Sequence, residues 1–297
     1  MQAKLTSEWL FRTFKSMSAT DYSNRHRHYT SYPVSPALSK YIDCVWMERF
    51  SHCPEFRGRD HLIVPDNTVE LIFTMHKIER RFNAGSQDAM ICKSHVAGLK
   101  TRPQYVKITG EVLLAVRFMP QGLYRFTDIP LTDTIDQSIP TEYLFGTDIQ
   151  QLEQQLLGAE KHVGQVALVN DYFTKKLFSS KRQENELFDH IAQRIIQSDG
   201  RVKIRDLSTE LNISTKTIER RFQEYLGISP KRYCQLIRFF QSLKTPFDPR
   251  KDCLGSLAYS TGYYDQMHFI KDVKKYTGLT PSVYFGMDKG IQGPIFL

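Results

Sequence analysis

A short sequence block is present twice near the carboxyl end of this 297-residue chain, and no other feature restricts the fold as strongly. Residues 226–230 (LGISP) recur at 277–281 (TGLTP), a shift of 51 positions. The same shift relates five further pairs: Leu207 and Ala258, Ser214 and Asp265, Ile218 and Phe269, Phe222 and Val273, and Tyr233 and Tyr284. In each pair, an apolar residue corresponds to an apolar residue or a helix cap corresponds to a helix cap. We therefore expect two copies of one structural unit.

Each copy has the pattern of a short helix, a tight turn and a longer helix. In the first copy, Ile204, Leu207 and Leu211 lie on one helix face, and Ser214 is a suitable N-cap for a second helix that ends at Gly227. A serine and a proline at 229–230 then begin a long helix. The pattern predicts two helix-turn-helix units at about 204–226 and 254–277, with turns at 211–213 and 261–263.

These units resemble the AraC/XylS family of bacterial transcription regulators. The residues that carry the resemblance are 220–222 (RRF) and 227–230 (GISP) in the first copy, and 262–269 (GYYDQMHF) and 278–281 (GLTP) in the second. The resemblance covers about residues 186–286. It implies an all-α DNA-binding domain, here at 186–288, in which a long helix (Pro230 to Leu243) joins two subdomains whose recognition helices enter successive major grooves on one face of DNA.

The first recognition helix has a polar outer face. If Ile218, Phe222 and Tyr225 point inward, the residues that point outward and are expected to read bases are Thr215, Lys216, Glu219, Arg220 and Gln223. Lys216 and Arg220 can donate to guanine, and Glu219 can accept from cytosine. The family resemblance places base contacts at these three residues. The alternative is a charged face that contacts only solvent.

The second recognition helix offers a different set of side chains. Its expected base-reading residues are Gln266, Met267, His268 and Lys271. Gln266 can pair with adenine and Met267 can contact a thymine methyl group. Lys271 and Val273 stand where the family often has Arg and Phe, so this helix is expected to be the less base-specific of the two. The expected phosphate contacts are Arg205, Ser214, Arg232, Lys274 and Lys275.

The charge distribution agrees with an anionic partner. The chain has 40 Lys and Arg against 32 Asp and Glu, a net charge of +8. Residues 181–297 contain 19 of these basic residues and 13 of the acidic ones, so +6 of the excess lies in this part. No apolar run is long enough to span a membrane, the first 15 residues do not resemble a secretory signal, and five cysteines without a CxxC pair favour a reducing cytoplasm. Association with the nucleoid is expected.

The first part of the chain has mixed periodicity, which predicts an α+β protein. Alternating residues at 69–73 and 112–118 predict antiparallel strands with one buried face, and spacings of three and four from Asp148 to Leu177 predict two helices. We expect an N-terminal arm (1–29), a β-rich, barrel-like effector-sensing domain (30–145), a helical dimerisation hairpin (146–178) and a polar linker (179–185). The all-α DNA-binding domain follows.

Residues 62–66 (LIVPD) and 116–120 (VRFMP) resemble an uncharacterised sensor type found upstream of such DNA-binding domains, and this resemblance names no ligand. Arg117 is expected in a surface salt bridge, with binding of an anionic effector as the alternative. Ser51-His52-Cys53 with Asp60-His61 is a weak metal pattern, and neither a metal nor another cofactor is predicted. Phosphate-binding and hydrolase motifs are absent.

The sequence therefore predicts a transcription regulator of the AraC type rather than an enzyme. Its expected partners are double-stranded promoter DNA, a small-molecule effector of unknown identity, a second copy of the chain and, if it is an activator, RNA polymerase. No membrane partner is expected. The alternatives are a DNA-modifying or repair enzyme with its chemistry at residues 30–145, and a structural DNA-binding protein without a ligand.

Overall fold

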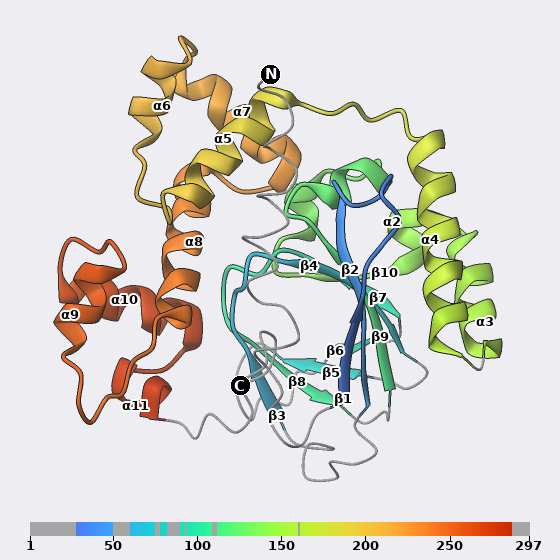
Figure 1. Ribbon diagram of the computed structural model, residues 1–297, viewed down its shortest axis with the longest axis horizontal. Helices are drawn as coiled ribbons and strands as arrows, with labels where there is room; N and C mark the ends of the chain where they lie inside the picture. The colour runs from blue at the N-terminus through green and yellow to red at the C-terminus, as the bar shows by residue number, and fades with distance from the viewer. Residues whose placement is uncertain are drawn as a thin grey trace.

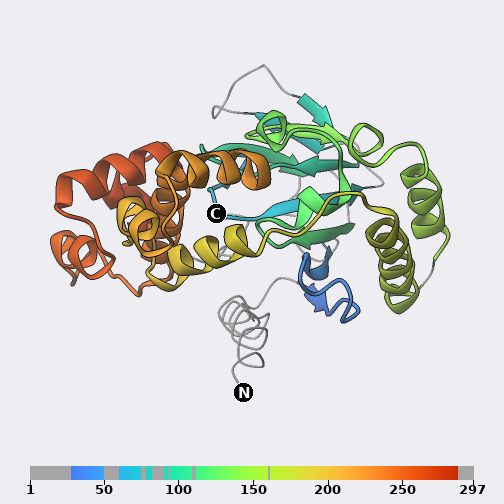
Figure 2. The same cartoon turned by 90° about the horizontal axis from the view of Figure 1, so that it is seen from above.

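The computed structural model describes residues 28–49, 60–74, 78–81, 90–92, 94–108, 112–159 and 161–286. Within these ranges a β-rich N-terminal region is followed by a helical C-terminal region, which confirms the predicted α+β class. Figure 1 shows the sheets between a helical hairpin on one side and the C-terminal helices on the other, and Figure 2 shows the same order from above. Residues 1–27 of the predicted arm lie outside the described residues, while residues 28–29 belong to β1.

Two antiparallel sheets form the N-terminal region. The six-stranded sheet has the order β1-β2-β9-β4-β7-β10, and the four-stranded sheet has the order β3-β8-β5-β6. The strand bounds are β1 His28–Tyr32, β2 Ile42–Arg49, β3 Asp60–Ile63, β4 Val69–Thr74, β5 Ile78–Arg81, β6 Met90–Cys92, β7 His95–Ala97, β8 Gln104–Ile108, β9 Val112–Phe118 and β10 Ser138–Pro140. Two 3₁₀ helices follow β9: η2 (Gly122–Phe126) and η3 (Leu131–Thr134).

Strands β4 and β9 are buried on both faces, so the prediction of one buried face was wrong. Leu71 and Val116 pair across the two strands and lie in the apolar core, while Glu70 and Arg117 pair on the opposite face and are also buried. The residue alternation correctly identified the strands. It could not show that the second face is covered as well, because that covering comes from segments distant in the sequence.

Helices cover the apolar face of the six-stranded sheet. They are α2 (Thr141–Phe145), α3 (Ile149–Gly158) and α4 (His162–Ser179), and the last two form the predicted hairpin. Phe173 of α4 is fully buried, and its ring centroid lies 5.6 Å from that of Phe118 and 5.1 Å from that of Phe126. This aromatic cluster fixes the hairpin to the sheet, on the side away from the C-terminal helices (Figure 1).

The C-terminal region contains the two predicted helix-turn-helix units, at opposite ends of a long helix (Figure 1). Its helices are α5 (Glu186–Gln197), α6 (Ile204–Glu210), α7 (Thr215–Leu226), α8 (Pro230–Lys244), α9 (Leu254–Ser260), α10 (Gln266–Thr277) and α11 (Pro281–Gly286). As the sequence predicts, Ser229 caps α8 by accepting from the Arg232 amide, and Pro230 occupies its first turn. No helix in the described ranges has the length and apolar character needed to cross a membrane.

Candidate nucleic-acid interface

Helix α7 separates an apolar inner face from a polar outer face. Ser214 Oγ accepts from the Thr217 amide at 3.1 Å, and the helix ends at Gly227 in the left-handed conformation. Ile218 and Phe222 are fully buried. The five predicted base-reading residues are all exposed on the outer face: Thr215, Lys216, Glu219, Arg220 and Gln223. The structure therefore places these residues together and orients them as the helical spacing predicts.

The charged residues of this outer face are not used in internal contacts. Among the described residues, Lys216, Glu219 and Arg220 form no ion pair, so Glu219 is not paired with a neighbouring arginine. Arg221, one position further on, is partly buried and bonds Glu224 at 3.1 Å. Of the predicted phosphate contacts, Arg205 on α6 and Ser214, the N-cap of α7, are both exposed.

Helix α10 repeats this arrangement in the second unit. Asp265 caps it by accepting from the His268 amide at 2.7 Å, and Phe269 and Val273 are fully buried. The exposed predicted residues are Gln266, Met267, Lys271, Lys274 and Lys275. Lys275 lies over the ring of Tyr276, 4.5 Å from its centroid, and desolvation lowers the pKa of its ammonium group. These residues form a second outer face that is less charged near its N-terminus.

His268 is only half-exposed, which agrees with packing better than with full projection into a groove. Its ring lies edge-on to Tyr263, with centroids 5.4 Å apart, and its Nε2 is 4.0 Å from Asp272 Oδ2. Burial raises the pKa of the Asp272 carboxyl, although the neighbouring His268 and Lys275 act in the opposite direction. His268 thus connects the outer face of α10 to a buried polar group.

The two units are not related by a single shift, and the predicted equivalence of Leu207 with Ala258 is wrong. Leu207 accepts from the amide of residue 211 and Leu257 from that of residue 261, so the short helices are related by a shift of 50. The longer helices keep the shift of 51. The second unit therefore has one additional residue between its turn and its N-cap, and that residue is Tyr264.

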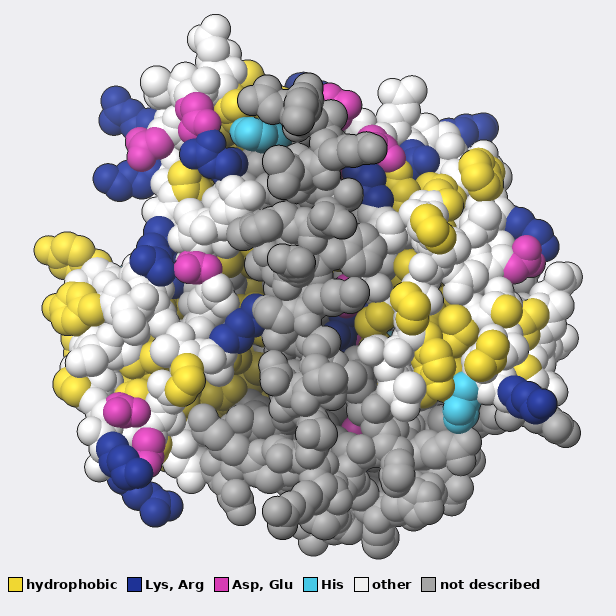
Figure 3. Space-filling view, in the orientation of Figure 1, with side chains coloured by type: hydrophobic (Ala, Val, Ile, Leu, Met, Phe, Trp, Pro, Cys, Tyr) yellow, Lys and Arg dark blue, Asp and Glu magenta, His cyan; other side chains and the backbone are white. Residues whose placement is uncertain are grey.

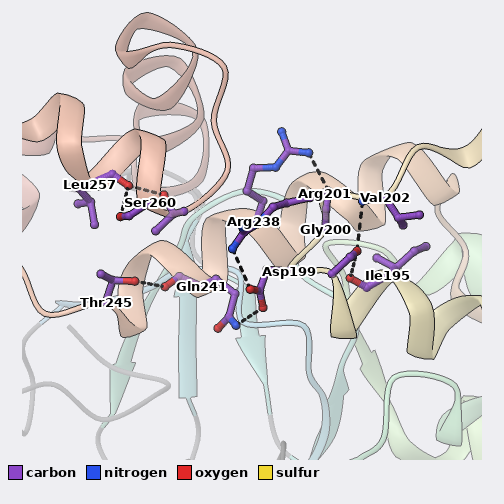
Figure 4. A network of polar contacts seen from close by, with 12 residues as sticks. Ile195, Asp199, Gly200, Arg201, Val202, Arg238, Gln241, Thr245, Leu257 and Ser260 are labelled. Atoms are coloured by element: carbon purple, nitrogen blue, oxygen red, sulfur yellow. Dashed lines mark hydrogen bonds and ion pairs between the residues drawn. The ribbon is translucent and has the colours of Figure 1, made fainter.

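Helix α8 contacts the turn before α6 and the turn before α10, and Figure 4 shows the polar network around these contacts. Arg238 donates from Nη2 to the Gly200 carbonyl at 2.7 Å, and its guanidinium lies 5.5 Å from the ring centroid of Tyr263. Gln241 bonds Asp199 in the same turn as Gly200. Gly200 has φ +71°, and a Cβ there would lie 2.2 Å from the Cys234 carbonyl oxygen. The turn before α6 and the turn before α10 thus contact one segment of α8.

The C-terminal end of α7 packs on the N-terminal region, a contact that local sequence patterns did not reveal. The Tyr225 ring centroid lies 4.2 Å from that of Tyr124, and Tyr124 donates its hydroxyl to Glu224 at 3.1 Å. Burial raises the pKa of the Tyr225 hydroxyl to about 12. Arg182 of the predicted linker lies 4.6 Å from the Tyr124 ring centroid. The linker therefore lies against both parts of the chain.

The start of α8 makes a second contact with the N-terminal region. Arg232, a predicted phosphate contact, donates from Nη2 to Thr101 Oγ1, and Thr101 in turn donates to Asp136 Oδ2 at 2.5 Å. Asn67 donates to the buried Tyr233 hydroxyl at 3.3 Å. Arg232 is thus partly buried against the N-terminal region, unlike Lys274, which is exposed.

Arg117 lies in a buried ion pair, so the expectation of a surface salt bridge was wrong. Its Nε is 3.0 Å from Glu70 Oε1, and the same oxygen accepts from Trp46 Nε1 at 2.9 Å. Glu48 and His95 are also buried on this strand face. These four polar side chains point to the side of the sheet opposite the apolar core. Ser51, His52 and Cys53 of the weak metal pattern lie outside the described ranges, and no three potential metal ligands cluster among the described residues.

Comparisons with known proteins support the separation of the chain into these parts. Residues 207–287 match the family of a helix-turn-helix domain, and residues 30–140 match a domain of unknown function, DUF6597. A comparison with curated proteins found no match.

A comparison with solved structures matched several chains, all with low sequence identity and TM-scores below 0.5. ToxT from Vibrio cholerae O395 has 12% identity and a TM-score of 0.43, with 89% of this chain and 98% of that chain covered. Unsaturated fatty acid-bound ToxT from Vibrio cholerae strain SCE256 has 12% identity and a TM-score of 0.42, covering 84% and 96%. The AraC-like transcriptional activator CuxR has 13% identity and a TM-score of 0.27, covering 94% and 92%.

The helix-turn-helix match begins within α6 and covers the rest of the first unit, the long helix and the second unit. It agrees with the resemblance inferred from the repeated sequence blocks. The chain therefore contains a region that belongs to a helix-turn-helix domain family, preceded by a region that belongs to a domain family of unknown function.

Proposed function

We propose that this chain is a transcription regulator of the AraC type that binds promoter DNA sequence-specifically, with α7 and α10 in successive major grooves on one face of the duplex. The observation that carries the proposal is the pair of exposed polar outer faces on the two longer helices, each beginning at a side-chain-capped N-terminus. In helix-turn-helix proteins the N-terminal residues of the second helix contact base edges. Two grooves one helical turn apart are separated by roughly 34 Å.

On α7 the base contacts are assigned to Lys216, Glu219 and Arg220. Lys216 and Arg220 lie one turn apart on the exposed face, where both can donate to guanine O6 and N7. Glu219 lies between them and can accept from a cytosine amino group, since phosphates would repel it. Thr215 and Gln223 extend the face at either end. This arrangement favours a G·C-containing half-site for the first unit.

On α10 the base contacts are assigned to Gln266, Met267, His268 and Lys271, and the exposed Lys274 and Lys275 contact phosphates. Arg205, Ser214 and Arg232 are the corresponding phosphate contacts of the first unit. Arg232 can serve in this way only when its contact with Thr101 is released. DNA binding is therefore coupled to the interface between the two parts of the chain.

The N-terminal domain is the proposed regulatory part. Its buried polar strand face, with Glu70, Arg117 and Trp46, is the proposed place where a small-molecule effector is sensed. Effector binding would shift the population of conformations in which α7 and α8 rest on this domain. We further propose a homodimer formed through α3 and α4, a cytoplasmic location at the nucleoid, and contact with RNA polymerase if the protein is an activator.

The test of sequence-specific binding compares two lysines. DNA duplexes are selected on the full chain from a random-sequence pool, and affinity is measured for selected and random duplexes over a range of salt concentrations. Lys216→Ala is expected to weaken binding to the selected duplex far more than to random DNA. Lys274→Ala is expected to weaken binding to both and to reduce the salt slope by about one unit.

Lys251→Ala is the matched control, because Lys251 is exposed but lies in the connection between α8 and α9. It should leave the affinity for the selected duplex nearly unchanged. Equal losses on selected and random DNA for Lys216→Ala would remove the base-reading assignment. A wild-type chain that selects no sequence from the pool would contradict the proposed function as a whole.

A further inference from the structure

Three large exposed hydrophobic residues lie close together in the sequence at one turn of the second helix-turn-helix unit. Tyr259 at the end of α9 is 66% exposed, Tyr264 before the N-cap of α10 is 87% exposed, and Met267 in the first turn of α10 is 61% exposed. Figure 3 shows hydrophobic side chains at the outer edge of the lobe that α9 and α10 form. A cluster of this kind on an otherwise polar surface indicates a binding surface.

The first unit has no such cluster at the equivalent turn. Thr209 stands where the second unit has Tyr259, and Lys216 stands where it has Met267. Tyr264 has no counterpart, because it is the additional residue that separates the shift of 50 from the shift of 51. The two units therefore present chemically different surfaces at the same position, one basic and one apolar.

The fold does not account for Tyr264. The apolar position of this turn is filled by Tyr263, which is 3% exposed and whose ring centroid lies 5.0 Å from that of Phe269. Ile213 occupies the equivalent position in the first unit. The chain thus places one tyrosine in the core and a second one in solvent, immediately before the recognition helix.

We propose that Tyr264 and Met267 read thymine methyl groups, so that the second half-site is recognised as a thymine-rich sequence. This inference rests on the proposed function, since it requires α10 to enter a major groove. The thymine methyl is the apolar group on a base edge in that groove, and apolar side chains recognise it by contact. Gln266, exposed beside Met267, can pair with the adenine of the same base pairs.

Charge on the same helix identifies DNA as the occupant of this surface. Lys271 and Lys274 are exposed on the outer face of α10, and no acidic side chain of α10 is exposed, because Asp272 is buried. An apolar patch bordered by lysines matches a base edge bordered by phosphates. If the surface binds a protein instead, the deoxyuridine experiment described below will show no effect at these residues.

The test removes the methyl groups and leaves the base pairs intact. In the duplex selected on the full chain, deoxyuridine replaces thymidine in one half-site at a time. For the wild-type chain we expect about a fourfold loss of affinity per contacted methyl in the second half-site, and a smaller loss in the first. Tyr264→Ala and Met267→Ala should each bind the unsubstituted duplex more weakly and respond less to deoxyuridine in the second half-site, and the double variant should no longer respond.

Val283→Ala is the control, because Val283 is also a large exposed hydrophobic residue of this domain, on α11. It should respond to deoxyuridine as the wild type does. The inference is overturned if deoxyuridine in the second half-site has no effect, or if Tyr264→Ala and Met267→Ala keep the wild-type response, which would assign the surface to another partner. Lys216→Ala in the same assay distinguishes the two hypotheses, since its loss of specific affinity supports the proposed function whatever the result at Tyr264.

Discussion

Single residues decide how closely the two parts of this chain approach each other. Gly227 ends α7 with φ +73°, and a Cβ at this position would lie 2.4 Å from the Leu131 carbonyl oxygen of η3. Glycine is therefore required at this position for two reasons: the left-handed backbone conformation and the close approach to Leu131. The sequence predicted the first requirement from the end of the helix. The second became visible only in the structure.

Gly227→Ala should loosen the contact between α7 and η3. We expect a loss of at least about 1 kcal/mol in the free energy of unfolding, because alanine is strained at positive φ and its methyl group would overlap the Leu131 carbonyl. Chemical denaturation of the full chain measures this. Gly164→Ala is the control, since a Cβ there meets no atom within 4 Å and the residue lies in a helix. It should be neutral or stabilising, and an equal loss would contradict the packing argument.

Asp272 should make stability dependent on pH. Burial raises its pKa above the ordinary value of 3.8, so the folded state binds a proton more tightly than the unfolded state does. Its contribution is favourable below pH 3.8 and is lost as the pH rises through the folded-state pKa. Asp272→Asn should therefore increase the free energy of unfolding at pH 7, and this gain should disappear at low pH. Asp171→Asn, at an exposed site, is the control, and a stabilisation that does not vary with pH would contradict this account.

At the scale of elements, periodicity predicted the helices well because each is amphipathic. Ser214 and Asp265 cap α7 and α10 as expected, and the inner residues of both helices are buried. The relation between the units was predicted less well. A single shift between two repeats cannot reveal an insertion within one of them. The hydrogen bonds of the two turns showed that the short helices are related by a shift of 50 positions and the long helices by a shift of 51.

The exposed side of α4 allows a prediction about dimer formation. Val163 is 73% exposed and Phe178 is 80% exposed, and at 100° per residue they lie about 60° apart around the helix axis. If this face forms a dimer, Val163→Ser combined with Phe178→Ser should shift the full chain toward monomer in sedimentation experiments. Val283→Ser, on α11, should not. A wild-type chain that stays monomeric at all concentrations would remove the dimer from the proposal.

At the scale of the whole molecule, the first helix-turn-helix unit is fixed more firmly to the N-terminal region than the second. The first unit contacts that region through Tyr225 and the adjoining Gly227, and the start of α8 contacts it through Arg232. In the second unit, a Cβ at Gly278, which ends α10, would lie 3.8 Å from Pro103. If the N-terminal domain regulates DNA binding as proposed, its signal would reach the first unit directly and the second unit through α8.

Thr101→Val should release Arg232 from this interface. Valine removes the oxygen that accepts from Arg232, so the guanidinium becomes available to a phosphate. We expect a few-fold increase in affinity for DNA of any sequence and a steeper salt dependence, by about one unit. Thr132→Val, at an exposed site on η3, should change neither. Unchanged binding by Thr101→Val would show that Arg232 does not link the interface to DNA.

Local sequence patterns were enough to predict the helix-turn-helix domain, because helix caps, turns and amphipathic periods each involve only a few neighbouring residues. They also predicted which side chains of α7 face outward. Long-range packing was needed to reveal the burial of Arg117 with Glu70, the second covered face of β4 and β9, and the contacts of Tyr124 with Tyr225 and of Arg232 with Thr101. These pairs join residues 47 to 131 positions apart. Such contacts depend on how whole elements pack, which no local pattern records.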